Sequence, residues 1–142
     1  MSQAQIWEPV RGLAVPCADI SLNWTSGTNA QLVVQMHFSR VRGGYDSDLE
    51  LSFKDAMYFA WEDESLNVMP IPKDLPLCKD PAFSDWVYPT LVLSDSPMAS
   101  GYADKAFEKD DPQHANVGHF LLVSMNDVLQ VISVGVPDVE VR

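Results

Sequence analysis

The sequence is short of positive charge, since its 142 residues include 9 Lys and Arg against 20 Asp and Glu. Proteins that bind nucleic acid need a cationic face for the phosphate backbone, so a formal net charge of −11 argues against that class. The chain also lacks an apolar run close to the roughly 20 residues of a membrane-spanning helix. We therefore expect a single domain over residues 1–142 that binds neither nucleic acid nor a membrane.

Cysteine is scarce as well. Cys17 and Cys78 lie far apart, and neither has a second cysteine at the spacing of a metal or redox motif. The first ten residues, MSQAQIWEPV, lack the basic and then apolar order of a signal peptide. These features predict reduced thiols and a cytoplasmic location.

Catalytic signatures are missing too. The sequence has no G-x-S-x-G elbow, Walker loop, Rossmann glycine fingerprint or H-E-x-x-H motif. His114 and His119 are five residues apart, a spacing that places them on one face of neither a helix nor a strand. We therefore expect no metal site, no other cofactor and no catalytic residues, although a cysteine nucleophile with a histidine partner stays open.

What the sequence does have is a strict alternation of apolar and polar residues over two segments. Between residues 31 and 39 the apolar face holds Leu32, Val34, Met36 and Phe38. Between residues 48 and 61 it continues through Leu49, Leu51, Phe53, Met57, Phe59 and Trp61, with a bulge or bend expected near Asp55. A period of two is typical of half-buried strands, so the segments predict an antiparallel meander with Trp61 in the core.

The remaining signals complete a mainly β chain. Trp86–Leu93 is predicted to be a strand, with Pro89 indicating an edge position or a bulge, and Ser96-Pro97 predicts the start of a short helix. Residues 119–123 and 128–133 predict a hairpin, and residues 139–141 a last short strand. The total of six to eight strands favours an antiparallel β-sandwich, or a strongly curved sheet, with one or two short helices.

The acidic residues are concentrated in one part of the chain. Residues 45–142 carry 18 acidic and only 6 basic residues. The alternation places three carboxylates on one strand face, and a run of three more follows the next strand: Asp46, Asp48, Glu50, Glu62, Asp63 and Glu64. Such a field would attract and steer a basic protein partner, so these six residues form the expected partner-binding surface. The alternative is a solvated surface that only keeps the protein soluble.

Two other functions fit different residues. Trp86 and Tyr88 are expected on one strand face, where they would line the pocket of a small-ligand-binding or enzymatic domain. In a homo-oligomeric structural subunit, Val33 and the edge strand Trp86–Leu93 would form the contact between copies.

Three stretches carry a family resemblance: DLELSFKDAMYFAWEDE, WVYPTLVLSDSP and HFLLVSMNDVLQVIS. Together with the acidic composition, they resemble small, mainly uncharacterised bacterial proteins, some of which look like immunity proteins of polymorphic toxin systems. The likeness covers about two-thirds of the chain and rests on hydrophobic alternation. It implies a single-domain protein that binds and blocks a partner and has no catalytic residues.

Overall fold

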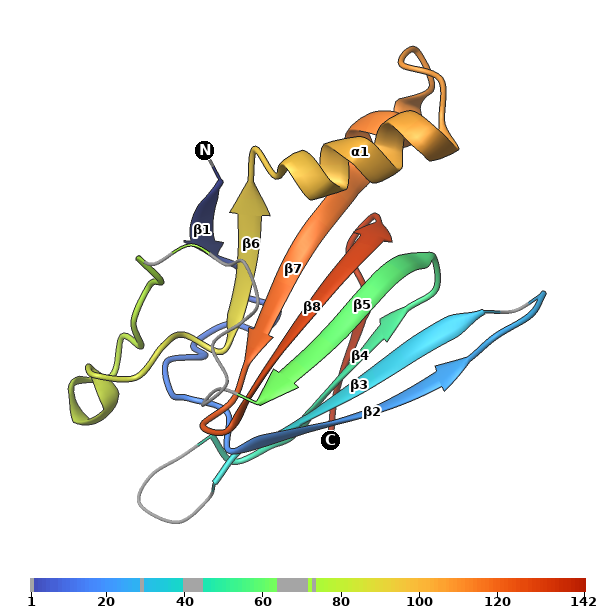
Figure 1. Cartoon of the computed structure of the whole chain (residues 1–142). Coiled ribbons are helices and arrows are strands. Elements are labelled where there is room, and N and C mark those ends of the chain that lie inside the picture. Colours follow the sequence, from blue (N-terminus) through green and yellow to red (C-terminus); the bar gives the residue numbers. More distant parts are fainter. Residues whose placement is uncertain (1, 29, 40–44, 64–71, 73) are drawn as a thin grey trace.

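The structure is a computed structural model and describes residues 2–28, 30–39, 45–63, 72 and 74–142 (Figure 1). Nine strands appear in these residues: β1 (Gln3–Ile6), β2 (Asp19–Thr25), β3 (Gln31–His37), β4 (Leu49–Phe53), β5 (Ala56–Asp63), β6 (Thr90–Ser94), β7 (Val117–Val123), β8 (Asp127–Val134) and β9 (Asp138–Val141). The helical segments are α1 (Pro97–Ala106) and two short 3-10 helices, η1 (Pro81–Phe83) and η2 (Pro112–Asn116).

The strands form two antiparallel sheets that stack as a sandwich and do not close into a barrel. The first sheet has the order β1-β6-β7-β8-β5 and the second the order β2-β3-β4-β9. The turn at Lys54-Asp55 carries the chain from β4 in the second sheet to β5 in the first (Figure 1). The predicted mainly β sandwich is confirmed, with one strand more than expected.

The core lies between the two sheets and is built from the predicted alternating faces. The apolar residues on the inner face of β3 and β4 are all buried, and they pack with buried residues of β7 and β8. Phe53 of β4 meets Phe120 of β7 edge to face, with ring centroids 5.5 Å apart and planes at 64°. Such pairs add a directional contribution to the burial of apolar area, so this contact joins the two sheets at their centre.

Helix α1 covers the outer face of the first sheet, where it packs on β7 (Figure 1). Its predicted start is confirmed: Ser96 is the N-cap, its Oγ accepts a hydrogen bond from the Ala99 N–H, and Pro97 opens the helix. Ala99 and Ala103 form the buried side. The helix continues through Gly101 and has ten residues.

Two strand predictions are corrected. The predicted meander over residues 31–61 is right for its first pair, since β3 pairs with β4 antiparallel. It is wrong for the third strand, because the other edge of β4 pairs with β9, and β5 pairs with β8 in the other sheet. The expected irregularity near Asp55 is confirmed, as the register of β5 shifts between Ala56 and Tyr58. The predicted edge strand Trp86–Leu93 begins only at Thr90 and lies between β1 and β7, so it is an interior strand.

The structure also contains strands that the sequence analysis missed. Strand β1 has only four residues, too few for a clear period. Strand β2 does alternate through Ile20, Leu22 and Trp24, so its signal was present in the sequence. The turn expected at residues 42–44 lies outside the described residues.

Candidate functional site

The predicted acidic strand face is held in polar contacts on the outer surface of the second sheet. Glu50 accepts hydrogen bonds from Arg142 Nη2 at 3.0 Å and from Gln35 Nε2 at 3.4 Å, and Arg142 also binds Glu140. The hydrogen bond from Arg142 lowers the pKa of Glu50 and keeps the carboxylate ionised. Part of the Glu50 charge is therefore met within the chain, which weakens this residue as a docking point for a basic partner.

Asp48 joins the ends of neighbouring strands. Its Oδ2 lies 3.0 Å from Nδ1 of His37, and its Oδ1 accepts from the backbone N–H of Phe38 at 3.3 Å. Strand β4 begins only at Leu49, so Asp46 and Asp48 precede the strand. The prediction of one strand face is therefore wrong for Asp46, which lies in a bend. Asp48 exchanges two backbone hydrogen bonds with Arg142, and its side chain contacts His37 on the face that also holds Glu50.

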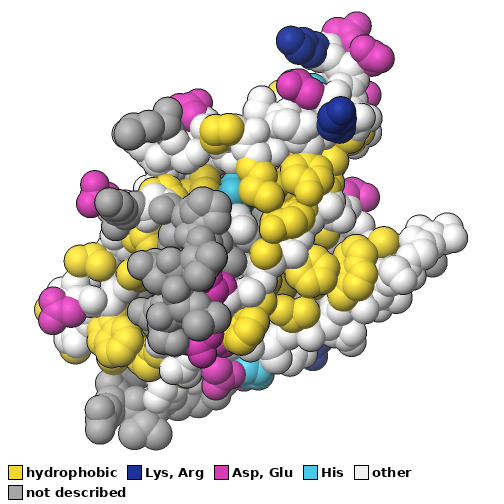
Figure 2. All heavy atoms as spheres, viewed as in Figure 1, with side chains coloured by type: hydrophobic (Ala, Val, Ile, Leu, Met, Phe, Trp, Pro, Cys, Tyr) yellow, Lys and Arg dark blue, Asp and Glu magenta, His cyan; other side chains and the backbone are white. Residues whose placement is uncertain are grey.

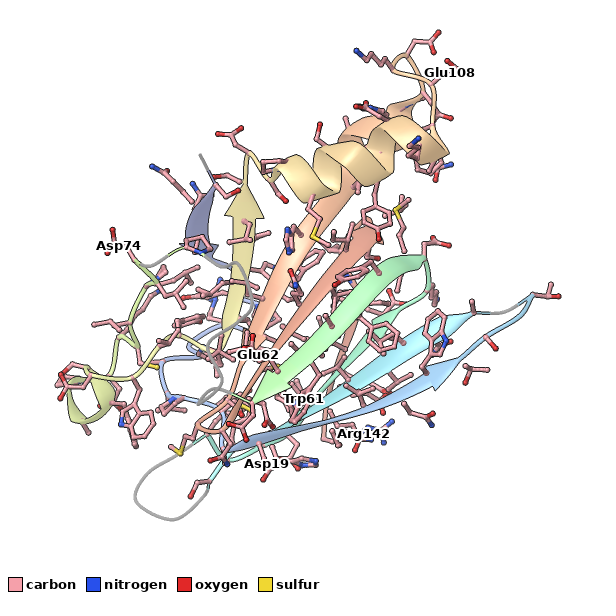
Figure 3. All side chains as sticks on the ribbon, in the orientation of Figure 1. Asp19, Trp61, Glu62, Asp74, Glu108 and Arg142 are labelled. Carbon is pink, nitrogen blue, oxygen red and sulfur yellow. The ribbon has the colours of Figure 1, made fainter. Side chains whose placement is uncertain are left out.

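Six carboxylates of the described residues nevertheless lie toward one end of the sandwich, which we call the acidic end: Asp19, Asp46, Asp48, Glu62, Asp63 and Asp127. Strand pairing brings these residues together. Asp19 at the start of β2 pairs with His37, and Asp63 at the end of β5 pairs with Asp127. Figure 3 labels Asp19 and Glu62 at this end. Four of the six predicted binding residues thus lie here, Glu50 lies further along β4, and Glu64 is outside the described residues.

A pocket of about 780 Å³ opens at the acidic end. Asp19 contributes to its rim, and apolar side chains, among them Phe83 and Trp86, line it together with Met125 of the β7–β8 turn. Trp86 is 42% exposed, so its ring is available to a bound group. An aromatic ring close to a carboxylate suits a cationic group with an apolar stem, such as the side chain of Lys or Arg.

Tyr88 does not line this pocket, which corrects the predicted Trp86 and Tyr88 pair. The Tyr88 ring is fully buried, and its hydroxyl donates to the Leu13 carbonyl at 2.7 Å. Burial raises the pKa of Tyr88 well above its usual range. The residues preceding β6 are in an irregular connection, where strand alternation does not hold, and Tyr88 packs inward as a core residue.

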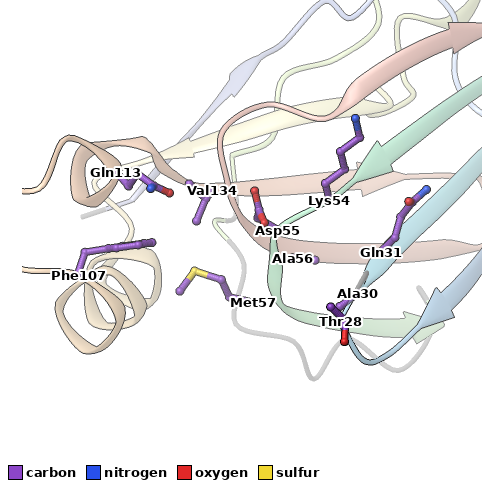
Figure 4. Close-up of a pocket in the computed structure, with 10 residues that line it drawn as sticks. All are labelled: Thr28, Ala30, Gln31, Lys54, Asp55, Ala56, Met57, Phe107, Gln113 and Val134. Atoms are coloured by element: carbon purple, nitrogen blue, oxygen red, sulfur yellow. The ribbon is translucent and has the colours of Figure 1, made fainter.

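A second pocket of about 780 Å³ lies at the opposite end, between the β2–β3 and β4–β5 turns and the segment that follows α1 (Figure 4). Thr28, Asp55, Met57 and Phe107 contribute to its lining. Lys54, which also lines it, forms an ion pair with Asp138 at 2.8 Å.

A buried polar chain lies under α1. Ser96 Oγ is 2.7 Å from Nδ1 of His119, and Nε2 of His119 is 2.8 Å from Oε1 of Gln130. An amide oxygen only accepts, so Nε2 carries the proton and Nδ1 accepts from the serine hydroxyl. Burial lowers the pKa of His119 and keeps the ring neutral. Ser96 is itself buried and lines neither pocket. The hydrogen bonds from Ser96 through His119 to Gln130 therefore fasten α1 to the sheet and do not present a nucleophile.

Replacing Ser96 with alanine is expected to lower the free energy of unfolding by about 1 kcal/mol, since it removes the helix N-cap. It also leaves Nδ1 of His119 without its donor. Ser100→Ala is the matched control, because Ser100 is exposed on the same helix. Urea denaturation followed by circular dichroism measures both variants. Equal stabilities for the two would contradict the fastening role of Ser96.

His114 and His119 have separate partners. Nε2 of His114 lies 2.8 Å from Oδ1 of Asp104, whereas His119 is enclosed under α1. Among the residues that the structure describes, no three His, Cys, Asp or Glu side chains are grouped to hold a metal ion.

The two cysteines are buried and free. Burial raises the pKa of Cys78 to about 11 and raises the pKa of Cys17 further. Cys17 Sγ donates to the backbone carbonyls of Asp19 and His37. Both thiols stay protonated at neutral pH, which disfavours either as the cysteine nucleophile that the sequence left open.

The prediction that Trp61 lies in the core is wrong. It lies two residues beyond Phe59 on the same face of β5, and Phe59 packs against the core. Trp61 is nevertheless 54% exposed, because the sheets do not cover each other fully along the side formed by β2 and β5. Figure 2 shows hydrophobic side chains gathered over β5 and beside it.

Comparison of this chain with protein-family models, with curated proteins and with solved structures gives no match. Within the described residues, no helix has both the length and the apolar character needed to cross a membrane.

Proposed function

We propose that this chain is a non-enzymatic binding protein that holds a basic protein partner at its acidic end, as an immunity-like inhibitor would. The observation that carries the proposal is the coincidence of the Trp86 pocket with the acidic end. Interfaces draw most of their affinity from a few aromatic or arginine anchors in pockets, surrounded by a polar rim. The pocket supplies the anchor point, and the carboxylates supply the rim.

The charge of the chain supports a basic partner over an acidic one. A net charge of −11 on 142 residues steers basic proteins toward the surface at low salt. Association of this kind is fast at low salt and weakens as salt rises, because the Debye length shrinks from about 10 Å at 0.1 M to about 3 Å at 1 M.

The test is capture of partners from the source lysate on immobilised protein, followed by a salt gradient and mass spectrometry. We expect one basic protein, released at moderate salt. The double variant Asp19→Lys, Asp127→Lys and the single variant Trp86→Ala should each lose it. With the partner purified, calorimetry should show at least a tenfold loss of affinity for Trp86→Ala, the cost of one hot-spot side chain.

The matched control is the double variant Glu108→Lys, Asp110→Lys, which changes the net charge equally. Figure 3 labels Glu108 beyond the end of α1, far from the acidic end. Retention of the partner by this control, together with its loss from the acidic-end variant, supports the proposed site. Equal losses would contradict the site, and absence of any basic partner at every salt concentration would contradict the function.

A second candidate function is small-ligand binding in the same pocket. Its volume of about 780 Å³ lies within the range of about 300–1,000 Å³ that is typical of small-molecule sites. A thermal-shift screen distinguishes the two functions. A low-molecular-weight ligand that stabilises the native chain but not Trp86→Ala would favour this second function.

A further inference from the structure

Strand β2 is the outermost strand of the second sheet (Figure 1). It pairs with β3 over seven consecutive residues without a register shift, and no described strand pairs with its other edge. An edge of this kind presents a row of backbone donors and acceptors to any strand that can lie beside it.

The usual protections of an edge are missing from β2. Its sequence, DISLNWT, contains no proline and no glycine, and Asp19 at its first position is its one charged residue. The other edges are better protected. Strands β1 and β9 have only four residues each, β9 carries Asp138 and Glu140, and the register of β5 is irregular. Of the edges in the described part of the chain, β2 is the one best shaped to accept another strand.

The inner side of β2 is also incompletely covered. Ile20, Leu22 and Trp24 alternate on the face that continues the core, yet Leu22 and Trp24 are each 39% exposed. The Trp24 ring lies 5.4 Å from that of Phe59, so the exposed residues are continuous with the packed interior. A strand added beside β2 would extend this apolar face and cover it.

We propose that a second copy of this chain pairs with β2, antiparallel about Leu22, to give a two-fold symmetric dimer with one continuous eight-stranded sheet. In this register Leu22 faces Leu22 of the other copy, Ile20 faces Trp24, and Asp19 faces Thr25. Each apolar residue of the inner face then meets an apolar residue, and the polar residues of the outer face meet one another.

Charge decides between a second copy and a basic partner at this edge. A basic strand would find one carboxylate, at the very start of β2. In the antiparallel register the Asp19 side chains of the two copies lie about 20 Å apart, six residues at about 3.4 Å each. That separation exceeds the Debye length of about 8 Å at physiological salt, so two acidic copies tolerate each other here. The two acidic ends lie at opposite ends of the paired strands, and Asp19 is the one acidic-end residue that belongs to β2.

The test is the mass of the protein in solution, measured by light scattering and sedimentation velocity at concentrations up to about 100 μM, where a contact of modest affinity is populated. We expect twice the chain mass of 15.8 kDa for the native protein. Leu22→Lys and Leu22→Glu should each halve that mass, because like charges then stand directly opposite each other at the two-fold axis. An equal mixture of the two variants should recover the dimer, as the lysine of one then faces the glutamate of the other.

Val136→Lys is the control, because Val136 is an exposed apolar residue of the β8–β9 turn and should leave the dimer intact. Far-ultraviolet circular dichroism checks that every variant keeps its strands. A native protein that stays monomeric, a dimer that survives Leu22→Lys, or a mixture that fails to reassociate would each overturn the proposed pairing.

Discussion

Replacing Phe53 with alanine is expected to lower the free energy of unfolding by about 3–5 kcal/mol. Phe53 is fully buried at the end of β4, and its ring packs edge to face on Phe120 of the opposite sheet. Phe120 also holds the Trp7 ring, with centroids 5.3 Å apart. Truncation therefore opens a cavity where both sheets and the N-terminal segment meet, and it removes the aromatic contact as well. Urea denaturation followed by tryptophan fluorescence measures the loss.

Two further variants separate the cavity from other effects. Phe53→Leu keeps most of the apolar volume, so it should cost clearly less than Phe53→Ala. Val136→Ala, at a side chain that is 72% exposed, should change the free energy of unfolding by less than about 0.5 kcal/mol. A Phe53→Ala protein as stable as the Val136→Ala protein would mean that this aromatic pair does not hold the sheets together.

The alternation in the sequence correctly predicted the side of the sheet on which each side chain lies, but it did not predict whether the opposite sheet buries that side chain. It assigned Leu32, Val34, Leu51 and Phe53 to the core, and all four are buried. It assigned Trp61 to the same interior by the same rule, and the face is right although the side chain is exposed. A period of two shows which way a side chain points from its sheet. Whether another sheet reaches that far depends on the length and twist of strands elsewhere in the chain, which local sequence does not contain.

The residues of the acidic end could also be predicted only in part from the sequence. The sequence analysis assigned Asp48, Glu50 and the acidic run after Trp61 to one partner-binding surface, because these residues lie close together along the chain. The structure places Glu50 further along β4, away from the end of the sandwich, and adds Asp19 and Asp127, which are far away in sequence. Their meeting depends on which strands pair, and the sequence analysis missed β2 and placed β5 in the wrong sheet.

The lining of the Trp86 pocket likewise depends on which segments meet in the fold. The sequence suggested a pocket near Trp86, and the structure places a pocket there. The pocket forms because the 3-10 helix η1, the β7–β8 turn and the segment before β2 meet at one end of the sandwich. Contacts between segments that are distant in sequence leave no periodic pattern. The sequence therefore indicated Trp86 but not the other residues that line the pocket.

Acidification is expected to destabilise the fold in a first step that belongs to His119. Burial lowers the pKa of His119 in the folded chain below its ordinary value of 6.5. Above that value the ring is neutral in both states, so stability does not change with pH. Below it the unfolded chain binds a proton that the folded chain excludes, and the free energy of unfolding falls by up to about 1.4 kcal/mol per pH unit. The fall ends once the folded pKa has been passed.

The carboxylates act in a separate and more acidic range. Hydrogen bonds to His114 and Arg142 lower the pKa of Asp104 and of Glu50 below their ordinary values of 3.8 and 4.5. Their contribution is fully present above those values and is lost as the pH falls through the lowered ones. Between about pH 6.5 and pH 5 the change in stability therefore reports on His119 and not on these two carboxylates.

The variant His119→Gln separates the two ranges by experiment. It removes the titrating ring, so its stability should be lower than that of the native protein at neutral pH and nearly constant down to about pH 5. Val136→Ala is the control and should keep the native slope, because it leaves every histidine in place. Denaturant titrations at several pH values give the slopes. A His119→Gln protein that loses stability as steeply as the native one would show that the proton is taken up elsewhere. In that case the buried His119 ring between Ser96 and Gln130 would not be the cause of the loss of stability below about pH 6.5.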